Sequence, residues 1–579
     1  MTRSITALAA AAALLAGCPS TDPEGGDPNA PPNVDGKPLI SLGDAYGEDA
    51  AKTFPGLATL PNLDDDNSNG TPDWLDNEAG DLVAEDNDLA TFVVPASVWT
   101  DLADGRSYRL NMHGEVRNFR IWHDGEIVLG AVDGDDLETW TLPTSTEDLS
   151  FQVEARSMLS QAWVALEQME GDESVDNDWT FLTASPLILN HHLQQTEMVW
   201  VVDIPASGSS WISRFYNNEH MIDTYADVLG DQFTPVPGNQ YQGDVWIQDE
   251  IQIGWMNSPD ARTDLVIDSI RDRGLDDFPE DGIVGSNSGI GPDVVNETWG
   301  NPQQANSLDS FGNLEISPPV TVDGVEYPFG RIYFGGDSNR YPTRDLTDFL
   351  AEQRIQKPFM PNTAWLCVGH IDEVTSTVPD PSSDIGFKFV IGDIPSAYKI
   401  LEAQDEAMDL PRYARGSNEF GHGMATVGAI VNNNALRMEN EEIQEDILDP
   451  MAEQFMEELN LTEDDILRMP SLFESLPGCG NAALIPGMVN LIVTNRGEQT
   501  DVFLADPFTR DSDDPTVGQD EDPVIAHVID MMPNTLDLHF VDNWAVYHMQ
   551  LGEVHCGTNM MRTPEADWWS VAGHLLEGE

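Results

Sequence analysis

The sequence predicts a mixed α/β protein in which a β-sandwich precedes a larger domain of interleaved strands and helices. From about residue 46 to 175, short apolar runs alternate with polar residues and with Gly or Asp turns, as in antiparallel sheets. From about 178 onward, β runs such as EMVWVVDIP and GFKFVIGD are separated by helical segments, which favours an α/β domain. With 579 residues, the chain is long enough for both domains.

The N-terminal segment resembles the signal peptide of a bacterial lipoprotein. One arginine and a short Ala/Leu run are followed by Leu15, Ala16, Gly17 and Cys18. The apolar run is about half of the roughly 20 residues that span a bilayer, so a transmembrane helix is the weaker interpretation. We expect removal of residues 1–17, a lipid on Cys18, and a location outside the cytoplasm on a bacterial membrane, either periplasmic or at the cell surface. An ordinary secretory peptide is the alternative.

The next two segments are a predicted tether and the predicted β-sandwich domain. Residues 18–45 are rich in Pro, Gly and Asp without apolar periodicity, which indicates a flexible tether. Residues 46–177 form the predicted sandwich domain, in which 156–170 is compatible with either a strand or a helix.

An acidic stretch from 62 to 88 resembles a calcium-binding loop. In one register, alternate side-chain oxygens with a glycine fit the pattern, and a second register is equally open. The first register comprises Asp65, Asn67, Asn69, Gly70 and Asp73, and the second comprises Asn62, Asp64 and Asp66. We favour calcium over a solvated acidic loop, although the last glutamate of an EF-hand is absent.

Residues 178–579 form the predicted α/β domain, and their clearest helix is expected over 440–468. Apolar residues recur there at every fourth position, which is the spacing of a buried helical stripe. They are Ile443, Ile447, Met451, Phe455 and Leu459.

The charge of the chain excludes some partners. There are 26 basic and 102 acidic residues, giving a formal charge of -76, which argues against a basic surface for nucleic acid or anionic lipid. We therefore expect no nucleic-acid partner and membrane contact only through the lipid anchor. Cationic substrates are compatible with this charge, but selection for solubility or a salty habitat explains it equally well.

The remaining cysteines are Cys367, Cys479 and Cys556. An odd number leaves at least one thiol free, and a bridge between Cys367 and Cys479 is compatible with the sequence. We take Cys556, in LGEVHCGTN, as the candidate nucleophile, since a thiolate supported by a proton-handling group attacks well.

Candidate partners for this thiol lie in the segments VGHIDE and VWIQDEIQIGW. Asp249 and Asp372 could bind a planar guanidinium through paired hydrogen bonds, and His370 could protonate the departing nitrogen and then deprotonate water. Together they suit hydrolysis of an amidino carbon through a covalent thiouronium adduct. Two alternatives are a metal site formed by His370, Asp372, Glu373 and His555, and a cysteine protease, which would not need two further acids.

The order of several long motifs resembles the protein-arginine deiminases of the pentein superfamily. The motifs are WIQDE, DSIRDRGL, SLDSFGNLEISPPV, VGHIDE, PGMVNLIV and GEVHCGTN. The resemblance covers roughly residues 178–579 and, more faintly, 50–175. It implies a five-bladed α/β propeller after an immunoglobulin-like domain, and conversion of peptidyl-arginine to peptidyl-citrulline in peptides or proteins.

The resemblance also implies roles for individual residues. Cys556 would be the nucleophile, His370 the general acid and base, and Asp249 and Asp372 the guanidinium ligands. Trp246 would contact the aliphatic part of the arginine, and Arg273 would bind the substrate backbone. The other interpretation of Arg273 is an ion pair in an acidic protein.

Calcium is the cofactor that the resemblance implies. Its expected ligands near the cleft are Gln248, Glu250, Asp268, Ser269, Asp272, Glu315 and the carbonyls of Phe311 and Leu314. The outer cluster would comprise Asn62, Asp64, Asp66 and Asp73, with later acids such as Asp86 and Asp88.

Several features depart from the family pattern. Gln252 stands where the family usually has glutamate, and Gln550 and Leu551 stand where vertebrate members carry Arg and His. The predicted tether leaves no room for the vertebrate N-terminal domain, so dimerisation of the vertebrate kind is not expected. The rival functions are deimination or hydrolysis of free arginine, agmatine or another small guanidine, and a catalytically lapsed calcium-binding surface lipoprotein.

Overall fold

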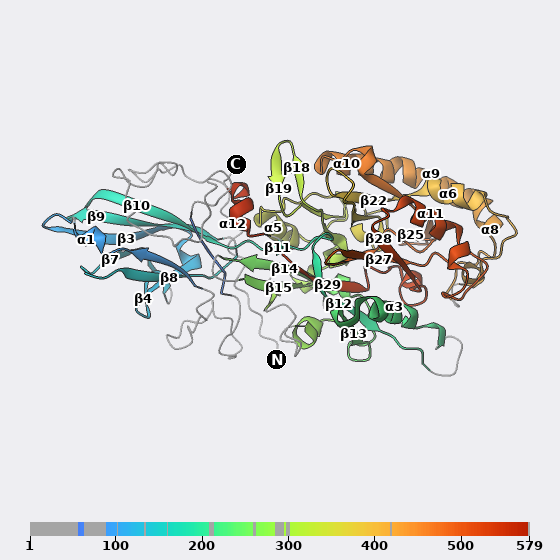
Figure 1. The fold of residues 1–579 in the computed structure, drawn as a ribbon, viewed down its shortest axis with the longest axis horizontal. Helices are drawn as coiled ribbons and strands as arrows, with labels where there is room; N and C mark the ends of the chain where they lie inside the picture. The colour runs from blue at the N-terminus through green and yellow to red at the C-terminus, as the bar shows by residue number, and fades with distance from the viewer. Residues whose placement is uncertain are drawn as a thin grey trace. The chain divides into compact units, whose positions relative to one another are not determined.

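A computed structural model describes most of the chain beyond residue 55 (Figure 1). The described residues are 56–62, 89–100, 102–132, 135–158, 160–207, 214–258, 262–271, 273–283, 294–296, 301–416, 420–564 and 566–576. Cys18, the tether, Asp272 and the acidic-loop residues from Asp64 to Asp88 lie outside them. Within the described ranges, no helix has both the length and the apolar character that a membrane span requires.

The chain divides into two compact units. The first extends to Ser185 and includes 257–261, and the second contains 186–256 and 262–579, so the division falls slightly after the expected 177. In the first unit, two five-stranded sheets share one core, to which Leu110 and Val164 contribute from one sheet and Phe92 and Phe151 from the other.

The strands of the first unit are as follows. One sheet has the order β1 (Leu57–Thr59), β10 (Glu173–Ala184), β9 (Gln161–Glu170), β3 (Arg106–Gly114) and β7 (Thr139–Thr141). The other has the order β2 (Ala90–Val94), β8 (Leu149–Ala155), β4 (Phe119–His123), β5 (Glu126–Val132) and β6 (Asp135–Leu137). The short helix α1 (Ser97–Thr100) lies between β2 and β3 in sequence.

Residues 156–170, whose sequence is compatible with a strand or a helix, contain the strand β9 (Gln161–Glu170). Ala162, Val164 and Leu166 on β9 are buried in alternation, while β9 pairs antiparallel with β3 and β10. Burial of every second residue between two partner strands therefore outweighs the local helical preference of 156–170.

The second unit is mixed α/β. Its largest sheet has six strands, in the order β13 (Phe233–Pro237), β12 (Gln195–Asp203), β26 (Ile492–Arg496), β27 (Gln499–Ala505) and β28 (Leu536–Val541), with β29 (Thr558–Thr563) pairing with β12. A four-stranded sheet comprises β11 (Ile188–Leu189), β14 (Ile251–Asn257), β15 (Arg262–Asp268) and β16 (Val294–Asn296). A three-stranded sheet comprises β21 (Thr375–Pro379), β22 (Phe387–Asp393) and β23 (Ile466–Pro470). The paired strands are β17 (Leu314–Ile316) with β20 (Ile332–Phe334), β18 (Val320–Val322) with β19 (Val325–Tyr327), and β24 (Phe473–Leu476) with β25 (Gly480–Ala483).

Helices separate these strands in sequence. They are α3 (Glu219–Leu229), α4 (Ile247–Glu250), α5 (Arg344–Glu352), α6 (Ile394–Glu402), α7 (Pro411–Ala414), α8 (Val427–Val431), α9 (Asn434–Ile443), α10 (Asp449–Glu458), α11 (Pro523–Met531) and α12 (Trp568–Val571). The N-terminus of α11 illustrates how the sequence begins a helix. The side chain of Asp522 accepts hydrogen bonds from the backbone N–H groups of Val524 and Ile525, and Pro523 occupies the first turn, where its missing N–H costs nothing.

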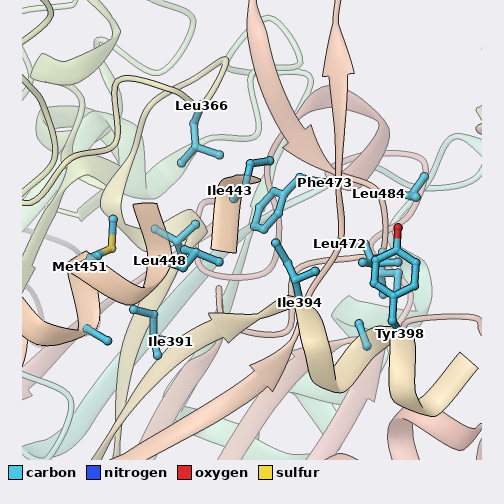
Figure 2. Packing of buried hydrophobic residues seen from close by; sticks show 14 of the residues in the cluster. Leu366, Ile391, Ile394, Tyr398, Ile443, Leu448, Met451, Leu472, Phe473 and Leu484 are labelled. Atoms are coloured by element: carbon cyan, nitrogen blue, oxygen red, sulfur yellow. The ribbon is translucent and has the colours of Figure 1, made fainter. Parts of the chain in front are cut away.

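The helix expected over 440–468 is shorter than predicted. The helical region runs from α9 through a π-helical turn into α10, and α10 ends at Glu458. Asn460 has φ 54°, the left-handed conformation that ends many helices, and Ile466 already belongs to β23. The apolar stripe was correctly placed, since Ile443, Met451, Phe455 and Leu459 are buried in one core and Ile447 packs half-buried against it. Figure 2 shows Ile443 and Met451 in this core.

Candidate active site

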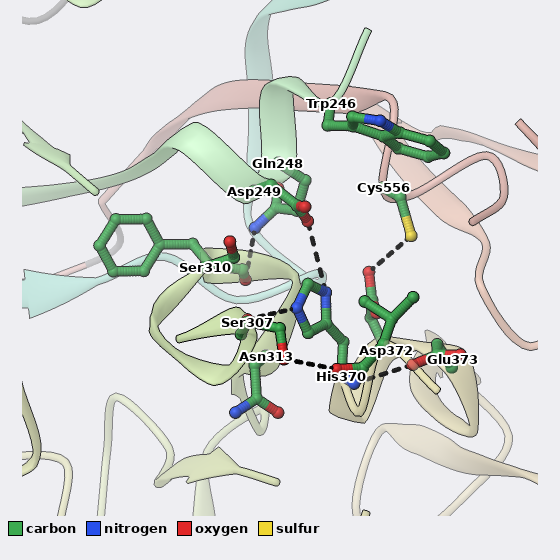
Figure 3. Close-up of polar contacts among 12 residues, drawn as sticks. Trp246, Gln248, Asp249, Ser307, Ser310, Asn313, His370, Asp372, Glu373 and Cys556 are labelled. Atoms are coloured by element: carbon green, nitrogen blue, oxygen red, sulfur yellow. Dashed lines mark hydrogen bonds and ion pairs between the residues drawn. The ribbon is translucent and has the colours of Figure 1, made fainter. Parts of the chain in front are cut away.

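Short elements of the second unit carry the four residues proposed for catalysis (Figure 3). Asp249 lies on α4, Asp372 on the 3-10 turn η8 (Ile371–Glu373), and Cys556 in the turn that precedes β29. His370 caps η8, and its backbone N–H donates to Glu373 Oε1 at 2.8 Å. The four segments are far apart in sequence, and the fold gathers them at one place.

Cys556 is buried and bonded as a thiol. Its Sγ donates to Asp372 Oδ2 at 3.3 Å and accepts from Asn490 Nδ2 at 3.2 Å. Burial, followed by the negative charges of Asp372 and Asp249, raises the pKa of Cys556 well above its ordinary value. The resting cysteine is therefore protonated at neutral pH, and a cation that neutralises the two carboxylates would favour its ionisation.

His370 is held between an acid and a carbonyl. Its Nε2 lies 2.6 Å from the carbonyl oxygen of Ser307, and its Nδ1 lies 3.4 Å from Asp249 Oδ1. Burial lowers the pKa of His370, but the charge of Asp249 and a hydrogen bond to it, with Asp372, raise the pKa to about 8. The imidazole is thus mostly protonated at pH 7, as a general acid requires.

Two buried carboxylate oxygens that face this site have little or no donor contact. Among the described residues, Asp372 Oδ1 accepts no hydrogen bond, and Asp249 Oδ1 has the long contact of 3.4 Å to His370 Nδ1. Burial would raise the pKa of Asp249, but His370 and Arg273 hold it below its ordinary value, so its carboxylate is anionic. Because buried acceptors without a donor are costly, the pair suits a planar cation that brings several N–H groups.

The space between these side chains is bordered by a glycine. A Cβ on Gly312 would lie 2.7 Å from His370 Nδ1, 2.8 Å from Asp249 Oδ1 and 3.2 Å from Asp372 Oδ2. Gly312 belongs to the 3-10 turn η7 (Phe311–Asn313). Asn313 joins this turn to η8, since its Oδ1 accepts from the backbone N–H of Ile371 at 3.1 Å.

Trp246 and Arg273 lie beside the same residues. The Trp246 ring packs edge-on against Tyr547 with ring centroids 5.6 Å apart, and a Cβ on Gly552 would collide with it. Arg273 Nη1 donates to Asp249 Oδ2 at 3.2 Å, and its Nε lies 3.5 Å from Glu250 Oε2. The structure therefore places Arg273 in the ion pair that the sequence offered as its second interpretation.

The residues named as calcium ligands separate into two groups. The Ser269 N–H donates to the Glu250 carbonyl at 2.8 Å, which brings Asp268, the last residue of β15, beside α4. Gln248 instead directs its Nε2 to the Phe311 carbonyl at 3.1 Å. Glu315, adjacent to Leu314, faces two histidines. Asn62, the outer-cluster residue within the described ranges, donates through Nδ2 to Glu154 Oε1 at 3.1 Å.

The side chains of the alternative metal site, His370, Asp372, Glu373 and His555, do not converge on one point. The backbone N–H groups of Gly369 and His370 donate to Glu373 Oε1, His370 contacts Ser307 and Asp249, and His555 Nδ1 lies 3.0 Å from Asp372 Oδ2. The side chains of His370, Glu373 and His555 thus have separate partners. The bridge between Cys367 and Cys479 is formed, and Cys556 is the free cysteine among the described residues.

Sequence reasoning missed two neutral residues. Asn490 bonds Cys556 Sγ, and its Nδ2 also donates to the Asp372 carbonyl at 3.1 Å, so it fixes the nucleophile against η8. Gly312 keeps the centre of the site open. Asn490 lies in the motif PGMVNLIV and Gly312 in SLDSFGNLEISPPV, so these motifs were the sequence signal that could have indicated the two residues.

Comparison with known proteins identifies the family. The sequence model described as protein-arginine deiminase (PAD) matches residues 174–570, which is more than half of the chain. The chain belongs to the protein-arginine deiminase family. This membership confirms the expectation drawn from the motifs.

Several relatives with this name show the extent of the similarity. Protein-arginine deiminase type-4 of Homo sapiens is 32% identical over 424 residues, covering 69% of this chain and 57% of that protein. The type-4 protein of Mus musculus is 33% identical over 378 residues, covering 62% and 54%. Type-3 of Homo sapiens is 31% identical over 392 residues, covering 62% and 53%. The chain thus spans a little over half the length of these relatives.

Proposed function

We propose that this protein hydrolyses the guanidinium group of arginine in peptides or proteins, giving citrulline and ammonia. The observation that carries the proposal is the gathering of one imidazole and two carboxylates around Gly312, with the thiol of Cys556 3.3 Å from Asp372 Oδ2. Among the described residues, Asp372 Oδ1 is a buried acceptor without a donor. The relatives are named protein-arginine deiminases, which supports arginine in proteins as the substrate class.

In the proposed reaction, Asp249 and Asp372 bind the guanidinium, and its positive charge neutralises the two carboxylates that keep Cys556 protonated. The thiol releases its proton to solvent, and the sulfur attacks the central carbon to form a tetrahedral adduct. His370 protonates one nitrogen, which leaves as ammonia, so a cationic thiouronium remains on Cys556. His370 then takes a proton from water, and the hydroxide adds to the same carbon. The C–S bond breaks as the new C=O bond forms, and the hydroxyl proton passes to the departing sulfur, so citrulline and the thiol of Cys556 result.

The test is direct measurement of both products. Purified full-length protein, incubated with a blocked arginine ester and calcium, is expected to release ammonia and citrulline in equal amounts. Production of urea would indicate cleavage of the other carbon–nitrogen bond and contradict deimination. Absence of both products, under conditions in which a related deiminase turns over, would leave the proposal without support and favour a lapsed enzyme.

Arg273 decides between peptidyl and free arginine as substrates. Its proposed role is to bind the substrate backbone, which requires that it exchange Asp249 for the substrate. Arg273→Ala is expected to lower kcat/KM for a blocked peptide by about 10- to 100-fold, since a charged hydrogen bond contributes about 1.5–3 kcal/mol. The effect on free arginine should be smaller.

The comparison needs a matched arginine outside the site. Arg262, which pairs with Asp264 on β15, provides it, and Arg262→Ala should leave both rates unchanged. Equal losses on peptide and free arginine in Arg273→Ala would mean that this residue only positions Asp249. A free-arginine rate above the peptide rate in the unmodified enzyme would favour the small-guanidine alternative.

Calcium is the proposed cofactor, and the donors near Glu250 fit it. Both carboxylate oxygens of Glu250 are buried without a hydrogen-bond donor among the described residues, and Asp268 and Ser269 follow on the adjacent chain. Such oxygen donors suit a hard cation. Calcium held there would neutralise Glu250, which now contacts Arg273. The groups around Glu315 do not fit calcium equally well, because Gln248 directs an N–H toward Phe311 and histidines flank Glu315.

Removal of calcium provides a separate prediction. Activity should fall by at least about tenfold in excess chelator and return with added calcium, because an activating ion orders its own ligand loops. The Glu250→Gln variant, in which Cys556 is unchanged, should bind calcium more weakly, as measured by calorimetry. Equal rates with calcium and with chelator would refute the switch and leave the chemistry unaffected.

The remaining parts of the proposal concern architecture and location. The two packed sheets of the first unit support an immunoglobulin-like domain, and family membership supports a five-bladed propeller for the second. The Leu-Ala-Gly-Cys segment supports a lipid anchor on Cys18 outside the cytoplasm.

A further inference from the structure

A second cluster of ionisable side chains lies behind the nucleophile. His192, Glu315 and His555 are all buried, and one ligand atom from each lies within 4.8 Å of the others. His555 Nε2 is 3.2 Å from Glu315 Oε1, and His192 Nε2 is 3.6 Å from Glu315 Oε2. Tetrahedral ligands around a zinc ion are about 3.3 Å apart, so these distances suit a shared cation.

Hydrogen bonds orient both imidazoles for metal binding. His192 Nδ1 lies 3.1 Å from the Thr377 carbonyl, which can only accept, so this nitrogen carries the proton. His555 Nδ1 lies 3.0 Å from Asp372 Oδ2, an acceptor when ionised. In both rings, Nε2 is then left with a lone pair directed at the Glu315 carboxylate. Three electron-rich groups face one another, and a proton or a metal ion must lie among them.

The surroundings leave room for a fourth ligand. His192, Glu315 and His555 line a cavity of about 30 Å³ together with Gln248 and Gln252. This volume is sufficient for about one water molecule. Gln252 is neutral, so Glu315 is the one carboxylate among the lining residues, beside the two imidazoles. That donor set favours a borderline transition ion over calcium, which prefers several oxygens.

The charges nearby include one that opposes a cation. Arg562 is buried close to the cluster, and its Nη atoms donate to the carbonyls of His192, Gln194 and Val493. Asp372 and Glu315 provide the negative charge on the other side.

We infer that His192, Glu315 and His555 bind a divalent transition ion, zinc foremost, with water as the fourth ligand. The ion would hold His555 Nε2 and thereby keep its Nδ1–H directed at Asp372, the carboxylate that contacts Cys556 Sγ. Such acid–histidine–metal chains fix the orientation of both groups. The ion is a positioning element beneath the nucleophile and takes no part in bond making. The inference does not depend on deiminase activity.

Direct metal binding tests this inference. The full-length protein, freed of metal by chelation, is titrated with Zn²⁺ by calorimetry and with Co²⁺ by visible absorption. We expect one ion per chain, with cobalt d–d bands of low-symmetry coordination and without a thiolate charge-transfer band. Zn²⁺ should also raise the unfolding temperature, since a ligand that binds only the folded state stabilises it.

Two neighbouring histidines provide a matched pair of variants. His192→Ala should weaken Zn²⁺ binding on the order of 100-fold, since even outer partners of a metal ligand contribute 10- to 100-fold. His191→Ala, which alters the adjacent buried histidine outside the cluster, should retain it. Comparable unfolding temperatures of the two metal-free variants establish that both fold.

Each contrary result has a defined meaning. Equal affinity in His192→Ala and the unmodified protein would overturn the assignment, as would a cobalt–thiolate band, which would place the ion on Cys556. Displacement of Zn²⁺ by an equal concentration of Ca²⁺ would show an oxygen-rich calcium site. Absence of any stoichiometric binding would mean that a shared proton joins the three groups.

Discussion

Gly312→Ala is expected to lower kcat/KM for peptidyl-arginine by at least about 100-fold, since a misplacement near 1 Å in an active site costs this much. The new methyl group would lie 2.7 Å from His370 Nδ1 and 2.8 Å from Asp249 Oδ1, in the space proposed for the guanidinium. Both side chains are tied elsewhere, His370 to the Ser307 carbonyl and Asp249 to Arg273. They must therefore give up those contacts or exclude the substrate.

Stability should change little in this variant. Gly312 does not have a positive φ, so alanine fits its backbone, and only side-chain tips have to move. Gly416→Ala is the control, because a Cβ there has nothing within 4 Å. Activity is measured as citrulline release and stability as the midpoint of thermal unfolding. Near-normal turnover in Gly312→Ala would show that the substrate binds elsewhere.

Asp372→Asn is expected to separate catalysis from the reactivity of the thiol. Loss of the anionic guanidinium ligand should lower kcat/KM by about 100- to 1,000-fold, the usual cost of removing one electrostatic contact to the reacting group. Yet Cys556 should react faster with neutral iodoacetamide near pH 8. After burial, the charge of Asp372 is the largest cause that raises the pKa of Cys556, so its removal moves the ionisation to lower pH.

The measurement is the alkylation rate of Cys556 against pH. In the unmodified protein the rate should still rise at pH values where an ordinary thiol has levelled off, and in Asp372→Asn the curve should shift to lower pH. Asp337→Asn, at a carboxylate that bonds the backbone of Asn339 and Arg340, should reproduce the unmodified curve. A shift to higher pH in Asp372→Asn would mean that Asp372 stabilises the thiolate, contrary to the geometry.

The sequence was most informative where a residue type has few alternative uses. Cys556, His370, Asp249 and Asp372 could be named because their side chains carry nucleophilic, acid–base and cation-binding chemistry, and they lie together in the structure. Gly312 and Asn490 could not be named as functional, because their roles depend on distances across the fold.

Local patterns predicted the elements better than their ends or their partners. The apolar stripe from Ile443 to Leu459 packs in or against the core, but the conformation of Asn460 and the pairing of β23 with β22 end the helix early. Likewise, β9 is a strand rather than a helix because it pairs with β3 on one side and with β10 on the other. The sequence could not predict that His192 lies beside Glu315, since these residues come from distant segments.

The most direct test of the central claim is citrulline formation from a blocked arginine peptide by the intact protein and by Cys556→Ala. The thiol is the atom to which the substrate carbon is proposed to bond, so the variant should form no citrulline above the uncatalysed background while retaining its fold by circular dichroism. Mass spectrometry of the intact enzyme during turnover should also find an adduct on Cys556. Turnover by Cys556→Ala at the unmodified rate would contradict the account.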